Sequence, residues 1–210
     1  MRNTRRKTAP KVVNGRVQRK SRHGPSNDYR LERRVAIERR RAGYDCRHVL
    51  TTDEVYSFIN RLPNWNRWAV GLSKIILDEG SETRFGWFRR GEIGLCAMPR
   101  DLKVRIWRDY FYRDQDFFDK YGVPYEEVVE TDDFGMPIER PNEFDCQFTR
   151  ATARCFTLLR TLTHELGHHH DRRTNRKGWC SRGEVYAERI RETLEKELES
   201  HYIELFGWPR

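Results

Sequence analysis

Four histidines, one glutamate and one aspartate lie within eight residues of this chain, in the stretch THELGHHHDRRT that begins at Thr163. His164 and His168 are one helical turn apart, so in a helix their imidazole rings share a face and can bind one metal ion. Glu165 lies beside that face, within reach of a water molecule on the metal. The pattern His-Glu-x-x-His is typical of a zinc site with two protein ligands and a general base.

The helix that carries this motif is expected to be buried. Large apolar residues occupy the stretch before and within it: Phe156, Leu158, Leu159, Leu162 and Leu166. The pattern predicts a long helix over residues 149–171. Side chains that only interact with solvent are not expected in such a buried helix, so the histidines are expected to have a specific function. A catalytic zinc site also requires a third protein ligand, which must come from elsewhere in the chain.

The last helix, expected over residues 183–205, supplies two carboxylates one turn apart. Glu184 follows His168 by 16 residues, which leaves room for a loop and a helix that returns beside the histidines. We expect Glu184 to be the third zinc ligand and Glu188 to accept the free N–H of a ligand histidine. Asp171 shares the face of His164 and is an alternative ligand or supporting group. A pair of solvated carboxylates is the alternative without a metal.

The residues His164-Glu165-x-x-His168, followed by Glu184-x-x-Ala187-Glu188, resemble the gluzincin metallopeptidases, and the HELGH motif is similar to the small gluzincins of the ImmA/IrrE kind. The resemblance spans about 30 residues. It implies that the two histidines and Glu184 bind Zn²⁺, that Glu165 is the catalytic base and that Glu188 supports a ligand histidine. It also implies hydrolysis of a peptide bond in a peptide or protein substrate.

Such a reaction needs a donor that stabilises the oxyanion. The candidates on the last helix are His201, Tyr202 and Tyr186. The strand GEIGLCAM, residues 91–98, is expected to be the sheet edge with which an extended substrate pairs. His169 and His170 are expected near the end of the motif helix, as groups that support the site rather than as ligands.

Other classes of protein remain open at this point. In a nucleic-acid-associated protein the zinc would be structural, with Cys180 or His170 as the fourth ligand. An inactive zincin-like regulator would keep the motif without catalysis. A peptide deformylase would use a cysteine ligand such as Cys96. Glu165 favours the enzyme, because a closed structural site needs ligands and no base. A metzincin is excluded, because Thr174 stands where its third histidine would be.

The elements that must position these residues follow from local patterns. Thr51 and Glu54 form a capping box for a helix over residues 51–62. A strand is expected over residues 68–77, and a hairpin joins residues 83–88 to 92–98. A helix over residues 101–121 comes next, with an acidic, loop-like insertion at 114–145. This order predicts an α+β fold like a minimal zincin, with a small mixed or antiparallel sheet on the buried motif helix and a helix-rich C-terminal part.

The net charge of +9 is concentrated at the N-terminus. Residues 1–43 hold 15 Lys and Arg against 3 Asp and Glu, a net +12, which leaves −3 for the rest. Residues 1–29 are expected to be a disordered tail, and residues 30–42 could form a basic helix, so the metallopeptidase domain is placed at 44–210. The tail suits nucleic acid or an acidic protein partner, or serves only to keep the chain in solution.

Composition limits the remaining possibilities. The chain of 210 residues is long enough for one ordinary domain, and it has no apolar run that could cross a membrane. The first residues lack the apolar segment of a secretory signal. Five cysteines without a C-x-x-C pair argue against a disulfide framework and against a zinc site built from cysteines. A cytoplasmic protein with reduced thiols is the resulting prediction.

Overall fold

The computed structural model describes residues 12–13, 16–17, 35–81, 84–128, 143–175 and 182–209. Residues up to Arg33 form one unit, and Arg34–Arg210 form a second, compact one. In the first unit, β1 (Val12–Val13) pairs with β2 (Arg16–Val17) in antiparallel orientation. The rest of the predicted tail and the middle of the acidic stretch, residues 129–142, lie outside the described residues.

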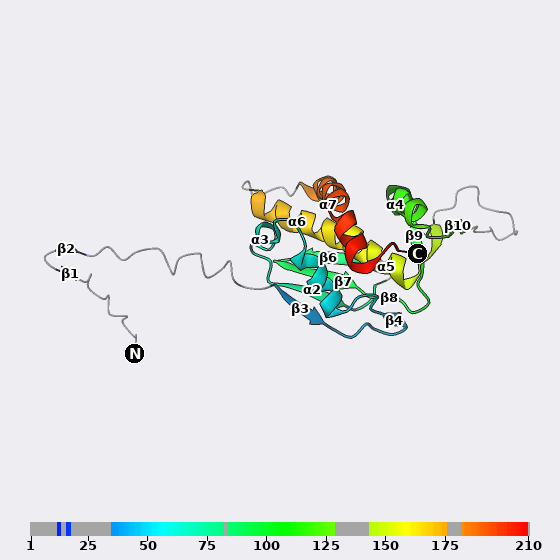
Figure 1. Cartoon of the computed structure of the whole chain (residues 1–210), viewed down its shortest axis with the longest axis horizontal. Helices are drawn as coiled ribbons and strands as arrows, with labels where there is room; N and C mark the ends of the chain where they lie inside the picture. Colours follow the sequence, from blue (N-terminus) through cyan, green and yellow to red (C-terminus); the bar gives the residue numbers. More distant parts are fainter. Residues whose placement is uncertain are drawn as a thin grey trace, which may run out of the picture. The chain divides into compact units, whose positions relative to one another are not determined.

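A mixed sheet of four strands is the centre of the compact unit (Figure 1). The parallel strands are β3 (Ala36–Arg39), β5 (Lys74–Asp78) and β7 (Glu92–Cys96). β6 (Gly86–Arg89) pairs antiparallel with β7 and forms one edge. Because side chains alternate along a strand, one face carries the apolar residues that pack under the helices. Ile37, Ile75, Ile93 and Phe88 lie in register on that face.

Helices cover this apolar face. α2 (Thr52–Asn60) buries Val55, Phe58 and Ile59, and its capping box, Thr51 with Glu54, is present as predicted. The motif helix consists of α5 (Arg150–Cys155), a π-helical segment η1 (Phe156–Leu162) and α6 (Thr163–Thr174). α7 (Gly183–Phe206) returns beside it, as predicted. The fold is therefore α+β, and its C-terminal part is rich in helix. No helix among the described residues is both long and apolar enough to span a bilayer.

A second, antiparallel sheet packs beside the motif helix. Its strands are β9 (Lys103–Trp107), β11 (Glu143–Gln147) and β10 (Tyr125–Glu127). α4 (Arg108–Tyr121) covers this sheet, with the ring of Phe111 stacked 3.8 Å from that of Phe144. The acidic stretch is therefore not a plain loop, because its described parts contribute the second half of α4 and two strands. Smaller elements are α3 (Trp65–Trp68) and the pair β4 (Cys46–Arg47) and β8 (Met98–Pro99).

Two predicted elements are wrong in type. The segment proposed as a basic helix, residues 30–42, contains β3, so the compact unit begins at Arg34 instead of residue 44. The strand forms because pairing with β5 sets Ile37 opposite Ile75 on the core face, and that burial overrides the weak helix preference of Arg and Glu. In the same way, the first part of the predicted helix 101–121 is β9, which pairs along its whole length with β11.

Of the remaining predicted elements, one strand is shorter than predicted, the hairpin is confirmed, and the motif helix contains an unpredicted π-helical segment. The strand predicted over residues 68–77 is shorter, because α3 and a turn take its first part and β5 begins at Lys74. The hairpin of β6 and β7 is confirmed, with Trp87 opposite Gly94. The motif helix is continuous as predicted, but it widens to a π-helix at η1, directly before the first motif histidine. Such segments are rare and are frequently found at functional sites.

The crossing of α6 and α7 is unusually close at one point. A Cβ atom on Gly167 would lie 2.7 Å from the Cα of Ala187 and 2.8 Å from its carbonyl oxygen. Neither backbone atom can move without shifting its helix. Glycine on one helix and alanine on the other therefore allow the backbone of α7 to approach the motif histidines, which lie on either side of Gly167 in the sequence.

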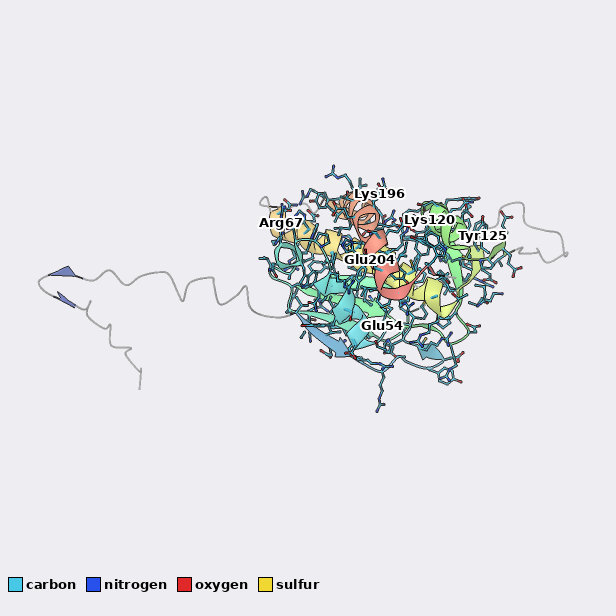
Figure 2. The ribbon with its side chains drawn as sticks, viewed as in Figure 1. Glu54, Arg67, Lys120, Tyr125, Lys196 and Glu204 are labelled. Atoms are coloured by element: carbon cyan, nitrogen blue, oxygen red, sulfur yellow. The ribbon has the colours of Figure 1, made fainter. Side chains whose placement is uncertain are left out.

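We predict that Gly167→Ala lowers the free energy of unfolding by about 1–3 kcal/mol, because the added methyl group overpacks the crossing. In an unhindered helix interior the same change would stabilise the protein by about 0.5–1 kcal/mol. Urea unfolding of the zinc-free protein measures the difference. Lys196→Ala, at an exposed position of α7 (Figure 2), is the control and should change little. A variant at residue 167 as stable as the control would contradict the prediction.

Candidate metal centre

Three predicted ligands meet where α6 and α7 cross. Nε2 of His164 lies 3.0 Å from Nε2 of His168, and the two rings are nearly perpendicular, at 82°. The carboxylate of Glu184 reaches both: Oε2 lies 3.2 Å from the first nitrogen, and Oε1 lies 3.3 Å from the second. Within the described ranges, these three side chains form the one group of histidine, cysteine and acidic residues that could hold a metal ion.

The three side chains converge closely enough to share one metal ion. The two nitrogens lie 3.0 Å apart, and each contacts a different oxygen of Glu184, at 3.2 and 3.3 Å. Zinc binds imidazole nitrogen and carboxylate oxygen at about 2.0–2.1 Å. Two neutral imidazoles and one carboxylate are also a donor set that suits zinc. The residues therefore fit the predicted metal.

Glu188 contacts the other side of the His164 ring. Its Oε1 lies 2.8 Å from Nδ1 of His164, which is the distance of a hydrogen bond. Burial lowers the pKa of His164, but Glu188, Glu165 and Glu184 outweigh that effect, and the pKa stands above its usual value. Burial and the neighbouring charge of His164 lower the pKa of His168. A proton on Nδ1, next to Glu188, would leave Nε2 of His164 available to the metal.

Glu165 is almost completely buried beside the three ligands. Burial raises its pKa to about 7, with a further contribution from the charge of Glu184, while His164 and Arg84 oppose the shift. Its carboxylate faces β6, because a Cβ atom on Gly86 would lie 3.1 Å from Oε1. A carboxyl group that titrates near neutral pH suits a base that accepts a proton and later donates it.

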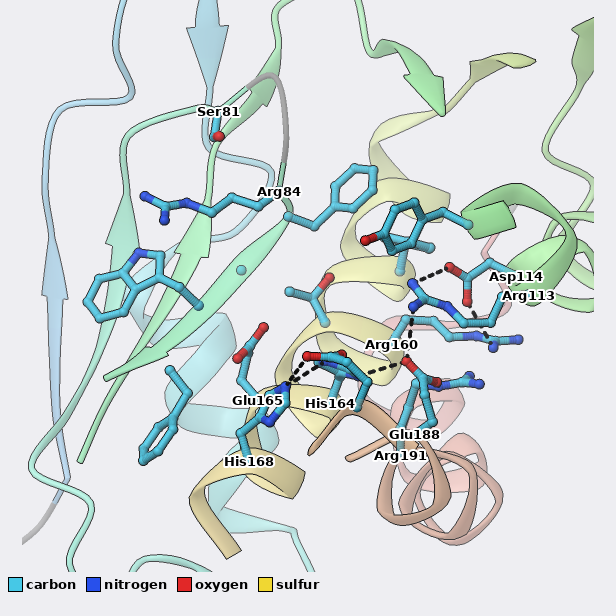
Figure 3. Close-up of a pocket in the computed structure, with 18 of the residues that line it drawn as sticks. Ser81, Arg84, Arg113, Asp114, Arg160, His164, Glu165, His168, Glu188 and Arg191 are labelled. Carbon is cyan, nitrogen blue, oxygen red and sulfur yellow. Dashed lines mark hydrogen bonds and ion pairs between the residues drawn. The ribbon is translucent and has the colours of Figure 1, made fainter. Parts of the chain in front are cut away.

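These side chains open into a cavity of about 1050 Å³ between the two sheets (Figure 3). Its lining falls into two kinds. Aromatic and aliphatic residues come from β6, β9, η1 and the start of α4: Phe85, Trp87, Phe88, Val104, Ile106, Trp107, Tyr110 and Phe156. Arginines line much of the remainder: Arg84, Arg105, Arg113, Arg160, Arg172 and Arg191. The candidate metal ligands and Glu165 also line this cavity.

Asp171 is not placed to bind the metal. Its carboxylate accepts hydrogen bonds from the backbone N–H and from Nε of Arg182, at 2.7 and 2.6 Å. These contacts fix the start of α7 against the end of α6, so Asp171 positions the helix that carries Glu184. Its roles as alternative ligand and as a group supporting a ligand histidine are therefore corrected to a structural contact.

None of the three predicted oxyanion donors is among the residues that line the cavity. Tyr202 is buried near the other end of α7 and donates to the carbonyl oxygen of Ala151. His201 contacts the carbonyl oxygen of Glu197 in its own helix. The hydroxyl of Tyr186 lies 2.8 Å from Nδ1 of His170. For His201 and Tyr202 the cause is the length of the 24-residue helix, of which only the first turns reach the motif histidines.

The neighbouring histidines are held in other contacts. His170 is engaged with Tyr186, and Nε2 of His169 lies 3.1 Å from the carbonyl oxygen of Val70. Neither belongs to the group of described residues that could bind a metal. Cys96 is buried on β7 and is also not part of that group. Cys180, the other proposed fourth ligand, lies outside the described residues.

The predicted substrate edge is also wrong. β7 lies between β5 and β6, so its backbone groups are already paired on both sides. The edge next to the motif helix is β6, whose Gly86 approaches Glu165 and whose Phe88 packs on the ring of His169. In the sequence both strands of a hairpin look alike, and only the partner strand of β7 distinguishes the edge from the interior.

Several lining residues were not singled out in the sequence. Arg113, Arg160 and Arg191 come from three different helical segments and contact acidic residues around the site (Figure 3). One part of this arrangement could have been predicted from the sequence. Glu188 and Arg191 are three residues apart, and Arg191 and Glu195 are four apart, which is the spacing of ion pairs on one helix face. No local sequence pattern indicates that Arg113 of α4 and Arg160 of η1 lie at this site.

Comparison with known proteins adds no relative: no family model, no curated protein and no solved structure matches this chain. The chemical interpretation therefore depends on the geometry of the site.

The raised pKa of Glu165 predicts a pH dependence of stability in the zinc-free protein. Between its usual pKa of 4.5 and about 7, the unfolded chain releases this proton while the folded chain keeps it. The free energy of unfolding therefore falls as the pH rises through this window, by up to about 3 kcal/mol from this group. We predict that Glu165→Gln removes this loss, so the variant is more stable than the wild type at pH 8 and similar to it at pH 4.

Urea unfolding at a series of pH values, with a zinc chelator present, measures this difference. Glu197→Gln, at an exposed position of α7, is the control and should follow the wild-type curve. A constant difference between Glu165→Gln and the wild type at all pH values would show that Glu165 ionises normally in the folded protein.

Proposed function

We propose that this protein is a zinc-dependent peptide-bond hydrolase, a metallopeptidase of gluzincin type on a zincin-like fold. The observation that carries the proposal is the convergence of two imidazole nitrogens and a carboxylate, close enough to share one metal ion, with Glu165 buried next to them. A structural site would need its ligands but would have no use for a buried carboxyl group of pKa about 7 that faces the cavity.

His164, His168 and Glu184 would hold the ion. Bound there, zinc would act as a Lewis acid that acidifies a water molecule and polarises a substrate carbonyl group. Glu165 would accept the proton of that water at its carboxylate and transfer it to the leaving amine. Glu188 would keep the Nδ1–H of His164 in place, so that Nε2 points to the ion.

The shape of the cavity favours an extended polypeptide as substrate. β6 is the open edge of the main sheet and lies along the motif helix, so a substrate strand can add to it by main-chain hydrogen bonds. Such pairing would bring a peptide bond past Gly86, where Glu165 lies. The absence of a side chain at this glycine lets the side chains of Thr161 and Glu165 lie directly against β6.

We predict that the purified protein contains about one zinc ion per chain and that His164→Ala, His168→Ala and Glu184→Ala each lose it. Elemental analysis after gel filtration measures the metal. Glu165→Gln should keep the zinc and reduce cleavage of a peptide library by about 10²–10⁴-fold, because it lacks only the base. Glu197→Gln, at an exposed position of α7, is the acidic control that should keep the zinc.

The outcomes separate the possible functions. Zinc in the wild type that survives Glu184→Ala would place the third ligand elsewhere. Equal cleavage by the wild type and Glu165→Gln would exclude the proposed base. Zinc without any cleavage would favour the inactive regulator or a structural site over the enzyme.

A further inference from the structure

Six charged side chains form a closed ring of alternating sign behind the metal ligands. Arg113 and Asp114 come from α4, Arg160 comes from η1, and Glu188, Arg191 and Glu195 come from α7. Three segments that are distant in the sequence thus contribute to one network. The ring has no formal net charge, because each of its three arginines lies between two of its three carboxylates.

Every link of the ring is a short contact between opposite charges. On the side facing the ligands, Arg191 Nε lies 2.5 Å from Glu188 Oε2, and Arg113 Nη1 lies 3.3 Å from Glu188 Oε1. Arg113 Nη2 continues to Asp114 at 3.4 Å. On the far side, Glu195 Oε2 lies 3.0 Å from Arg191 Nη1 and 3.2 Å from Arg160 Nε. Arg160 Nη1 closes the ring to Asp114 at 3.2 Å.

Five of the six side chains in the ring are mostly buried. Those of Arg160, Arg191 and Asp114 are 3%, 6% and 8% exposed, and those of Glu188 and Glu195 are 17% and 14% exposed. Arg113, at 36%, is the member that reaches solvent. Burying charges is costly unless each is paired, and removing one partner leaves a buried charge uncompensated. Exposed ion pairs contribute little to the free energy of folding, but a closed ring of paired charges fixes all of its members in one arrangement.

One member connects the ring to the metal site. Glu188 is the residue whose Oε1 contacts Nδ1 of His164 at 2.8 Å, and its two oxygens are held from opposite sides by Arg113 and Arg191. The carboxylate therefore cannot rotate away from the histidine without breaking the ring. Arg191 has no direct contact with the ligands, so any effect it has on them must pass through Glu188.

We propose that Arg191 is a positioning residue for the metal centre, which acts through Glu188 on His164 and is itself held in place by the ring of six charges. The proposal rests on the proposed function, because it assumes that His164 binds the ion through Nε2. It also assigns a role to α4: this helix, from the acidic part of the chain, closes the ring through Arg113 and Asp114. The guanidinium group is required, because it bridges Glu188 and Glu195 with separate nitrogen atoms.

The test is the zinc affinity of the apo protein, measured by competition with a chromophoric chelator. Arg191→Met should weaken zinc binding by about 10–100-fold, the effect typical of partners that orient metal ligands. Arg191→Lys should rescue only part of the loss, because one ammonium group cannot make both contacts. Glu195→Gln opens the ring at its far side and should weaken binding in the same direction, by a smaller factor.

Two carboxylates that are not members of the ring, but contact its arginines, provide matched controls. Asp116 contacts Arg160 at 2.7 Å but is 76% exposed, and Glu192 lies 3.9 Å from Arg191 and is 59% exposed. Asp116→Asn and Glu192→Gln should bind zinc within about twofold of the wild type, as expected for exposed ion pairs. If either control loses as much affinity as Arg191→Met, the ring is not the relevant unit.

Folding is checked separately, because Arg191→Met removes a buried charge. Glu195→Gln keeps the shape of the side chain, and burial already raises the pKa of Glu195 to about 7, so its neutral form is tolerated in the fold. If Arg191→Met does not fold, Glu195→Gln carries the test. A folded Glu195→Gln protein with wild-type zinc affinity would then overturn the proposal, as would a folded Arg191→Met protein with wild-type affinity.

A second readout, which needs no metal, separates this proposal from the proposed function. In the zinc-free protein the contact with Glu188 should protect the Nδ1–H of His164 from exchange and give a downfield proton resonance, assigned by its loss in His164→Gln. Arg191→Met should remove or broaden this resonance, and Asp116→Asn should keep it. If the wild type binds no zinc but shows this pattern, the proposed metallopeptidase function is wrong, whereas Arg191 still positions the ring of His164 through Glu188. A resonance unaffected by Arg191→Met would overturn the positioning role.

Discussion

The metal centre depends on how closely the backbones of α6 and α7 approach each other. Gly167 and Ala187 meet at the crossing, where a single additional methyl group would lie 2.7 Å from the facing Cα atom. Because the helices are so close there, the first turns of α7 bring Glu184 and Glu188 to opposite sides of the same imidazole ring. Larger residues at the crossing would separate the carboxylates from the histidines.

Burial gives the site its electrostatic character. Glu165 has a pKa near 7 because it is removed from water, and Glu188 keeps a lowered pKa despite burial because His164 and Arg113 lie next to it. The pKa values of these two carboxylates on neighbouring helices are thus shifted in opposite directions, which suits their proposed roles as a proton-transferring group and a fixed acceptor. The ring of charges around Glu188 has no net charge, so it can be buried and still hold this carboxylate in place.

Local signals identified the elements whose formation needs no distant partner. The capping box of Thr51 and Glu54, the hairpin of β6 and β7 and the helix α7 occur as predicted. The prediction failed at β3 and β9, where short segments of mixed composition could be helix or strand. Each is a strand because another strand lies beside it: β5 for the first and β11 for the second. Such pairing depends on contacts between residues far apart in the chain, and no local pattern reports them.

The sequence by itself determined the histidine pair and its neighbouring glutamate, because a spacing of four residues on a helix fixes which side chains share a face. It also identified the two carboxylates of α7, for the same reason. Only the tertiary structure decided that Glu184 and not Asp171 faces the histidines, that β6 is the open edge and that α4 and η1 supply charges to Glu188. Those outcomes depend on distances between separate elements, which are set by packing and not by the spacing of residues within one element.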